Sequence, residues 1–80
     1  MIRLGKTTKL APDQVLAKAA QYFGPAGLGL EAQDQGAAGA RWTGGGGFVY
    51  ISTCAGDRGT EVNLEAREWE APARDFVSRL

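Results

Sequence analysis

Cys54 is the only thiol in this 80-residue chain, which contains no histidine. A cysteine nucleophile needs a neighbouring base or a positively charged environment to become a thiolate, and Arg58 is the nearest cation in sequence. One Cys and no His also supply too few of the ligands that zinc and similar metals prefer. We therefore expect Cys54 to be a small, half-buried strand residue, and we expect no metal and no cofactor.

Glu61 and Glu65 come closest to a pair of catalytic carboxylates. Acid–base catalysis by two carboxylates requires that they converge in a cleft. These two lie four residues apart on one predicted strand, where their side chains face the same way, so we expect them to be surface charges. Because nothing in the sequence assembles a catalytic site, an enzyme that uses carboxylates or Tyr50 is the least favoured hypothesis.

The four consecutive glycines at 44–47 could form a loop that cradles a phosphate. Such loops are followed by a helix whose N–H groups point at the anion, usually with a Lys and a Ser or Thr. Here the following residues, 48–54, are rich in β-branched and aromatic side chains, which favours a strand. We therefore predict a hairpin turn that uses the positive φ angles glycine tolerates.

The elements that carry these residues are predicted from periodicity. Alternation of apolar and polar residues indicates strands over 1–10, 28–33, 38–43, 48–54 and 60–69, with a turn over 34–39. One helix begins at Pro12 and ends at Gly24, expected in a left-handed cap conformation, and a second begins near Pro72. The order β-α-β-β-β-β-α predicts a single α+β domain over residues 1–80. Its two layers are a curved antiparallel sheet and two helices on one face.

The two hairpin turns predict the register. A symmetric turn at 44–47 pairs Thr43 with Phe48 and Arg41 with Tyr50. A four-residue loop at 55–58, closed by Gly59, pairs Tyr50 with Asn63 and Ile51 with Val62. The apolar face under the helices then contains Trp42, Val49, Ile51, Val62 and Leu64. The opposite face contains Arg41, Phe48, Tyr50, Glu61, Asn63, Glu65 and Arg67, although a one-residue slip at either turn would move Phe48 and Tyr50 into the core.

Composition limits the partners. Nine Lys and Arg balance nine Asp and Glu, whereas a nucleic-acid binder needs a clustered excess of cations. No apolar run approaches the ~20 residues of a membrane span, so we expect neither nucleic acid nor membrane as a partner. A lone thiol without a signal peptide favours a cytoplasmic location. Because a chain this short buries a small core and no disulfide can stabilise it, we expect a homo-oligomer such as a homodimer.

Two functions follow. The leading hypothesis is a small non-enzymatic binding or interaction module that self-associates through its sheet, by the outward face or by an unpaired edge strand, since exposed aromatic patches mark partner sites. Its candidate interface residues are Arg41, Phe48, Tyr50, Arg67 and Trp69. The alternative is a module that binds a small apolar ligand in a pocket between sheet and helices, near Phe23, Trp42 and Phe76.

The order of elements over the whole chain resembles the TATA-binding-protein-like fold and a shortened form of the helix-grip domains (START and Bet v 1-like). The resemblance rests on element order and carries no functional residues. It implies a C-terminal helix across a curved sheet and, for the helix-grip group, an apolar ligand in the cavity beneath that helix. The short C-terminal helix predicted here leaves no room for a large cavity, and the neutral charge contradicts nucleic-acid binding.

Overall fold

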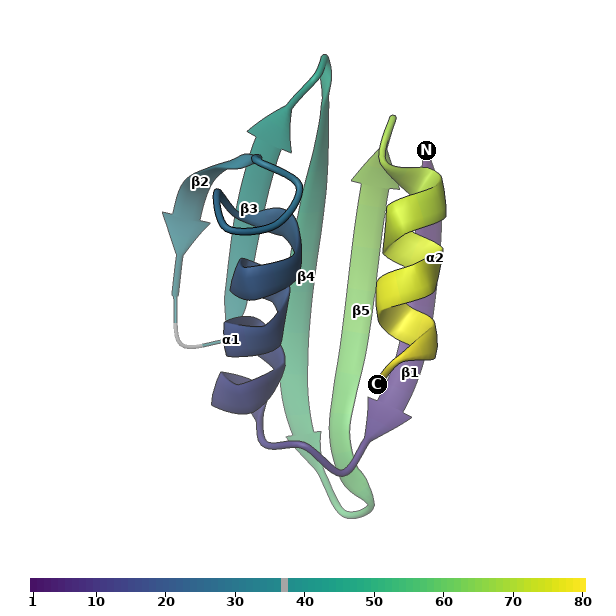
Figure 1. Cartoon of the computed structure of the whole chain (residues 1–80). Helices are drawn as coiled ribbons and strands as arrows, with labels where there is room; N and C mark the ends of the chain where they lie inside the picture. The colour runs from purple at the N-terminus through teal and green to yellow at the C-terminus, as the bar shows by residue number, and fades with distance from the viewer. Residues whose placement is uncertain (37) are drawn as a thin grey trace.

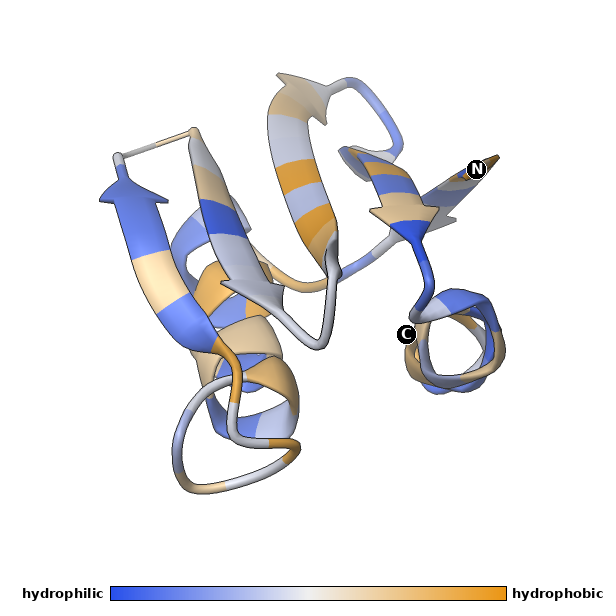
Figure 2. Cartoon of the chain, turned by 90° about the horizontal axis from the view of Figure 1, so that it is seen from above, coloured by the Kyte–Doolittle hydropathy of each residue, from blue (hydrophilic) through white to orange (hydrophobic). Residues whose placement is uncertain are grey.

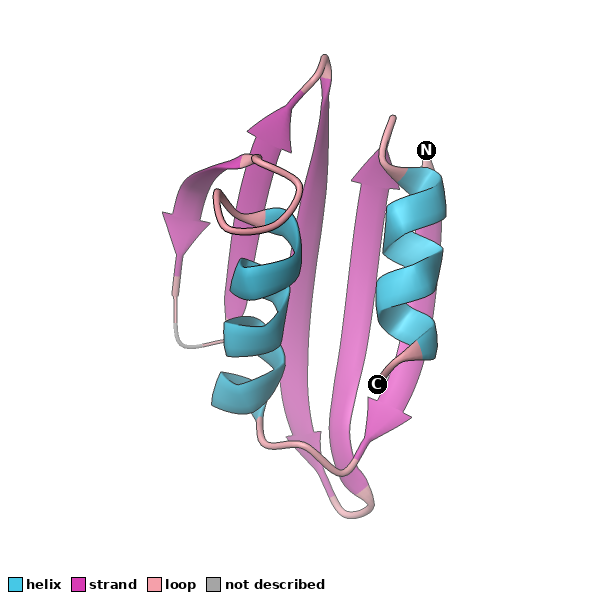
Figure 3. Ribbon diagram, viewed as in Figure 1, coloured by secondary structure: helices cyan, strands magenta, loops and turns pink. Residues whose placement is uncertain are grey.

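The computed structural model describes residues 1–36 and 38–80. In chain order these residues form β1 (Ile2–Thr8), α1 (Pro12–Phe23), β2 (Glu31–Gln35), β3 (Gly39–Gly44), β4 (Gly47–Gly56), β5 (Gly59–Arg67) and α2 (Glu70–Ser78). The strands form one antiparallel sheet in the order β1-β5-β4-β3-β2 (Figure 1). Both helices lie against the same face of the sheet (Figure 3). The predicted α+β class, element order and one-sided helix layer are confirmed.

Helix α1 begins with Pro12, whose missing N–H has no partner in a first turn in any case. Its buried residues are Val15, Ala19 and Phe23, spaced four apart so that they form one stripe against the sheet. The helix ends at Phe23 as predicted, but Gly24 has φ −72° rather than a left-handed angle. Glycine is required there because a Cβ atom would collide with the carbonyl oxygen of Ala20.

The strand predicted over residues 28–33 begins later, at Glu31. The N–H of Leu28 donates to the carbonyl of Tyr22, and the N–H of Leu30 donates to that of Phe23. These bonds satisfy carbonyls that the end of a helix leaves unpaired, so residues 28–30 form part of the loop that caps the C-terminal end of α1. The strand then continues through Asp34 and Gln35, which were predicted to form a turn. Residue 37, inside that predicted turn, lies outside the described residues.

The four glycines form the tight hairpin between β3 and β4. Gly45 and Gly46 have φ angles of 57° and 83°, the left-handed pair that a two-residue hairpin turn needs. The predicted pairing of Thr43 with Phe48 is confirmed. Gly47 has a different requirement, because a Cβ atom there would collide with the carbonyl oxygen of Arg67. The run therefore serves the turn and its close contact with the end of β5.

The register between β4 and β5 differs from the prediction by two residues. Tyr50 lies opposite Glu65, not Asn63, and Ile51 lies opposite Leu64, not Val62. The reason is a shorter turn, in which Gly56 pairs with Gly59 and only two residues lie between them. Because side chains in a strand alternate with a period of two, a shift of two leaves every residue on its predicted face.

The core lies between the sheet and the helices. Figure 2 shows hydrophobic and hydrophilic residues alternating along the strands, with both helices on one side of the sheet. The five residues predicted for the inner face are all buried, namely Trp42, Val49, Ile51, Val62 and Leu64. They pack with Phe23 of α1 and Phe76 of α2, so one hydrophobic core joins the two layers.

Candidate interaction surface on the outer face of the sheet

The side of the sheet opposite the helices is called the outer face. Its residues on the four strands with regular register are Arg3, Gly5, Thr7, Gly39, Arg41, Thr43, Phe48, Tyr50, Ser52, Cys54, Glu61, Asn63, Glu65 and Arg67. Pairing with β3 adds Glu31 and Asp34 of β2. Neither helix covers this face (Figure 2), so it is open to a partner.

One row of paired residues crosses the outer face from edge to edge. Arg3 pairs with Glu65, and Glu65 pairs with Tyr50. Tyr50 pairs in turn with Arg41, and Arg41 pairs with Asp34. This central row therefore reads positive, negative, tyrosine, positive, negative, with Tyr50 on the middle strand of the sheet.

Direct contacts fix part of the central row. The Arg3 Nε atom lies 3.3 Å from Glu65 Oε1. The guanidinium carbon of Arg41 lies 4.6 Å from the centre of the Phe48 ring, within the range of a cation–π contact. Phe48 is half-buried beneath it, whereas Tyr50 keeps 39% of its surface exposed. Tyr50 is thus the apolar centre of the outer face, with charges on both sides.

Four of the five candidate interface residues come together on the outer face. Arg41, Phe48 and Tyr50 are neighbours, and Arg67 lies directly opposite Phe48. The fifth, Trp69, is separate from them, because it packs against the hydrophobic core.

The alternation of β5 ends before Trp69 is reached. Glu68 has φ 70°, a left-handed conformation that turns the chain toward the helix layer. The indole N–H of Trp69 donates to the carbonyl oxygen of Gly44 at 2.8 Å. Trp69 therefore anchors the glycine hairpin to the start of α2 and does not join the candidate interface residues on the outer face.

Cys54 is exposed, so the prediction of a half-buried residue is wrong. It shares the parity of Phe48, Tyr50 and Ser52 on β4, and that parity faces away from the helices. Cys54 lies opposite Glu61. Its parity was the signal in the sequence that could have placed it on the surface. Glu61 is exposed and Glu65 half-buried on this face, and the two do not converge in a cleft.

The three candidate pocket residues form part of the core. Phe23, Trp42 and Phe76 are 0%, 1% and 3% exposed. The Phe23 ring centre lies 6.0 Å from that of Trp42 and 5.2 Å from that of Phe76. These are the distances of packed aromatic pairs. The sequence grouped these rings correctly, and their side chains fill the space between sheet and helices.

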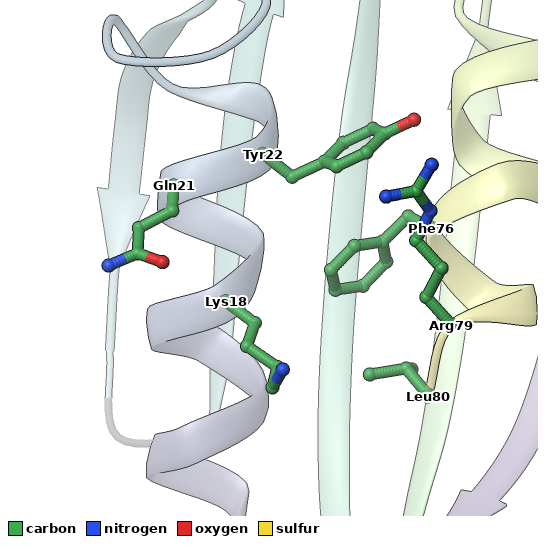
Figure 4. Close-up of a pocket in the computed structure, with 6 residues that line it drawn as sticks. All are labelled: Lys18, Gln21, Tyr22, Phe76, Arg79 and Leu80. Carbon is green, nitrogen blue, oxygen red and sulfur yellow. The ribbon is translucent and has the colours of Figure 1, made fainter.

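An open groove lies between the two helices instead. Its volume is about 250 Å³, and it is lined by Lys18, Gln21, Tyr22, Phe76, Arg79 and Leu80 (Figure 4). Small-molecule sites usually enclose about 300–1,000 Å³, so this groove is small as well as open. Phe76 is the one candidate pocket residue that lines it.

A polar contact missed by the sequence reasoning joins the helices beside this groove. Figure 4 shows Tyr22 reaching from α1 toward α2, where its hydroxyl donates to Asp75 Oδ2 at 2.6 Å. This bond raises the pKa of Tyr22 and lowers the pKa of Asp75, and it is the largest cause of each change. Arg79 Nε lies 3.1 Å from the same carboxylate oxygen. The Asp75–Arg79 pair was visible as an i,i+4 spacing, whereas the Tyr22 partner comes from 53 residues away.

Comparisons with known proteins add no relative: the chain matches no protein-family model, no curated protein and no solved structure. The likeness to TATA-binding-protein-like and helix-grip domains therefore stays a prediction from element order. Among the described residues, no helix is long and apolar enough to cross a membrane. The same residues contain no group of three or more His, Cys, Asp or Glu side chains that could hold a metal ion.

Proposed function

We propose that this protein is a small non-enzymatic interaction module that associates with a second copy of itself through the outer face, around Tyr50. The observation that carries the proposal is the central row, which presents an exposed tyrosine between charges of both signs on a face that neither helix covers. Tyrosine is enriched at protein interfaces, because its ring can be buried against a partner while its hydroxyl keeps a polar contact.

The types of residue on the outer face support this proposal. Protein interfaces are enriched in Tyr and Arg and depleted in Lys. Among the described residues, every cation on the outer face is an arginine, namely Arg3, Arg41 and Arg67. The lysines lie elsewhere, and Lys6 of β1 has the opposite parity. Such a composition suits a surface that is covered for part of the time.

The edge strands support self-association less well. Strand β2 is exposed along its whole length, carries Glu31 and Asp34, and has a register shift between Ala32 and Asp34. Strand β1 carries Arg3 and Lys6. Charged side chains and bulges on edge strands discourage pairing with another chain. We therefore place the contact on the outer face rather than at an edge.

The proposal is tested by sedimentation velocity over a range extending to high micromolar concentrations. We expect a concentration-dependent dimer that Tyr50→Lys weakens at least about tenfold, the size of a hot-spot effect. Ala17→Lys is the matched control, because Ala17 is exposed on α1 and lies in the other layer. Circular dichroism should show both variants folded. A wild-type chain that stays monomeric at the highest concentration would refute the proposal.

Binding of a small apolar ligand is the alternative function. With Phe23, Trp42 and Phe76 packed together, the hollow next to this cluster is the groove between α1 and α2, which Phe76 lines. Lys18, Gln21 and Arg79 give that groove a mixed polar lining. Because such a lining suits an apolar ligand poorly, self-association remains the preferred function. Saturable changes in tryptophan fluorescence with lipids or aromatic molecules would support the alternative.

A further inference from the structure

The central row is complementary in charge to its own copy in only one of two simple face-to-face arrangements. Two identical sheets that stack by their outer faces are related by a two-fold axis lying between them. That axis can run along the strands or across them. The proposed self-association is the premise of this inference, and the pattern of charges distinguishes the two axes.

An axis along β4, through Tyr50, exchanges the two sides of the sheet. Strand β5 then lies over β3 of the partner subunit, and β1 lies over its β2. Glu65 faces Arg41 of the partner subunit, and Arg3 faces Asp34 of the partner subunit. The two Tyr50 side chains meet on the axis. Each of the four charges in the central row thus lies opposite a charge of the other sign.

An axis across the strands places each strand over its own copy. Arg3 then faces Arg3 of the partner subunit, Glu65 faces the partner's Glu65, and Arg41 faces the partner's Arg41. Like charges placed opposite each other in an interface disfavour that arrangement and help to fix register. The central row therefore opposes this axis at every charged position.

The neighbouring rows are compatible with the axis along β4. The row of Asn63, Ser52 and Gly39 carries no charge. In the row of Phe48, the side chain of Arg67 would face Thr43 of the partner subunit, and the two Phe48 rings would meet near the axis. Packed sheets are usually rotated by about 30°. Contacts near the axis, including the central pair of Arg41 and Glu65, are the least displaced by such a rotation.

We infer that the protein forms a two-fold dimer with its outer faces together and the axis along β4, in which Arg41 pairs with Glu65 of the partner subunit. The broad face is limited in area, because the Cα extents of the chain are 36 × 21 × 17 Å. The projected area of the broad face is roughly 750 Å², near the ~800 Å² that each partner buries in a standard interface. A dissociation constant in the micromolar range is expected for a contact centred on one row.

A mixing experiment tests the charge pairing. Arg41→Glu alone gives a dimer in which the introduced carboxylate would face Glu65 of the partner subunit, and Glu65→Arg alone gives one in which two guanidinium groups face each other. Each variant should associate at least about tenfold more weakly than the wild type. An equimolar mixture of the two should form a heterodimer, because the pairs that repel in each homodimer can then be replaced by pairs of opposite charge. A mixture that associates no better than its components overturns the inferred axis.

Cys54 provides an independent distance, because it is the only thiol in the chain and lies on β4, four residues beyond Tyr50. With the axis along β4, the two Cys54 Cα atoms should be about 10 Å apart, the usual separation of stacked sheets. With the axis across the strands, the two Cys54 residues lie on opposite sides of the axis. Their distance is then about 29 Å, which combines eight residues of ~3.4 Å rise along the strands with the separation of the sheets. A dimer formed through the β1 edges would give about 24 Å, five strand spacings.

A short bismaleimide should therefore cross-link the wild-type dimer through Cys54. The matched control is Cys54→Ser combined with Thr7→Cys, which moves the thiol to β1 on the same face, where the two sulfur-bearing residues would be about 22 Å apart. Cross-linking of the wild type alone supports the inference. A dimer in solution that does not cross-link at Cys54 overturns the inferred axis but leaves self-association standing, whereas a strict monomer overturns both.

Discussion

Replacing Phe23 with alanine tests whether the aromatic cluster is a filled core or a ligand pocket. Phe23 is fully buried and touches the rings of Tyr22, Trp42 and Phe76. A buried Phe→Ala change costs about 3–5 kcal/mol. A domain of this length is stable by roughly 4–12 kcal/mol at 0.05–0.15 kcal/mol per residue. Phe23→Ala should therefore remove a large part of the stability, whereas Phe23→Leu should cost less than about 1.5 kcal/mol.

The cavity left by Phe23→Ala should bind a small aromatic molecule. Its walls would include the rings of Trp42 and Phe76, and engineered apolar cavities stay dry and accept benzene. Benzene should then stabilise the variant by about 1.4 kcal/mol at ten times its dissociation constant. The wild-type chain should gain no such stability, because the Phe23 side chain already occupies the space.

The assay is urea unfolding followed by tryptophan fluorescence, with and without benzene. Trp42 is buried in the core, so its emission should report the loss of packing. If Phe23→Ala is unfolded without ligand, two results still test the packing of residue 23. These are the recovery of the folded state when benzene is added and the small loss of unfolding free energy in Phe23→Leu. The reasoning is refuted if benzene stabilises the wild type as much as the variant, or if Phe23→Ala costs less than about 1 kcal/mol.

Two further predictions concern two separate features, the Tyr22–Asp75 hydrogen bond between the helices and the glycine hairpin. The pKa of Asp75 lies below its ordinary value of 3.8. This shift contributes folding stability that is lost as pH falls through the lowered pKa. The pKa of Tyr22 lies above its ordinary value of 10.0. This shift contributes folding stability that is lost as pH rises through the raised pKa. Tyr22→Phe should therefore be less stable than the wild type at neutral pH and should approach it at both extremes in unfolding measurements; a difference independent of pH would contradict this. In the hairpin, Gly46→Ala should cost about 1–2 kcal/mol for a left-handed alanine. Gly47→Ala should cost more, because its Cβ meets the Arg67 carbonyl, and equal losses in thermal unfolding would argue against that contact.

Local features of the chain were sufficient to predict most elements. Pro12 and Gly24 set the predicted bounds of α1, because proline suits a first helical turn and glycine a helix end. The glycine run predicted the first hairpin and its register, because few other sequences permit two successive positive φ angles. Phe48 and Tyr50 were placed on the correct face for the same reason, since register at that turn sets parity along β4.

Errors occurred where a distant partner decided the local structure. Residues 28–30 alternate like a strand, but their N–H groups bond to the end of α1. Gly24 looked like a left-handed cap, whereas its constraint is the nearby Ala20 carbonyl. The bond between Tyr22 and Asp75 joins two helices that are separated by most of the sheet in sequence. No periodicity within one element encodes such contacts.

The sequence alone predicted the face of each paired residue from Arg41 to Arg67, because alternation sets parity and an error of two residues leaves parity unchanged. Only the tertiary structure decided which outward residues are neighbours. With the register predicted from the turn, Tyr50 would lie beside Asn63, and the charges would not form the central row. The two-residue turn after Gly56 places Glu65 beside Tyr50, and the pairing of β1 with β5 places Arg3 beside Glu65. The candidate surface depends on these long-range pairings, which are set by packing across the whole sheet.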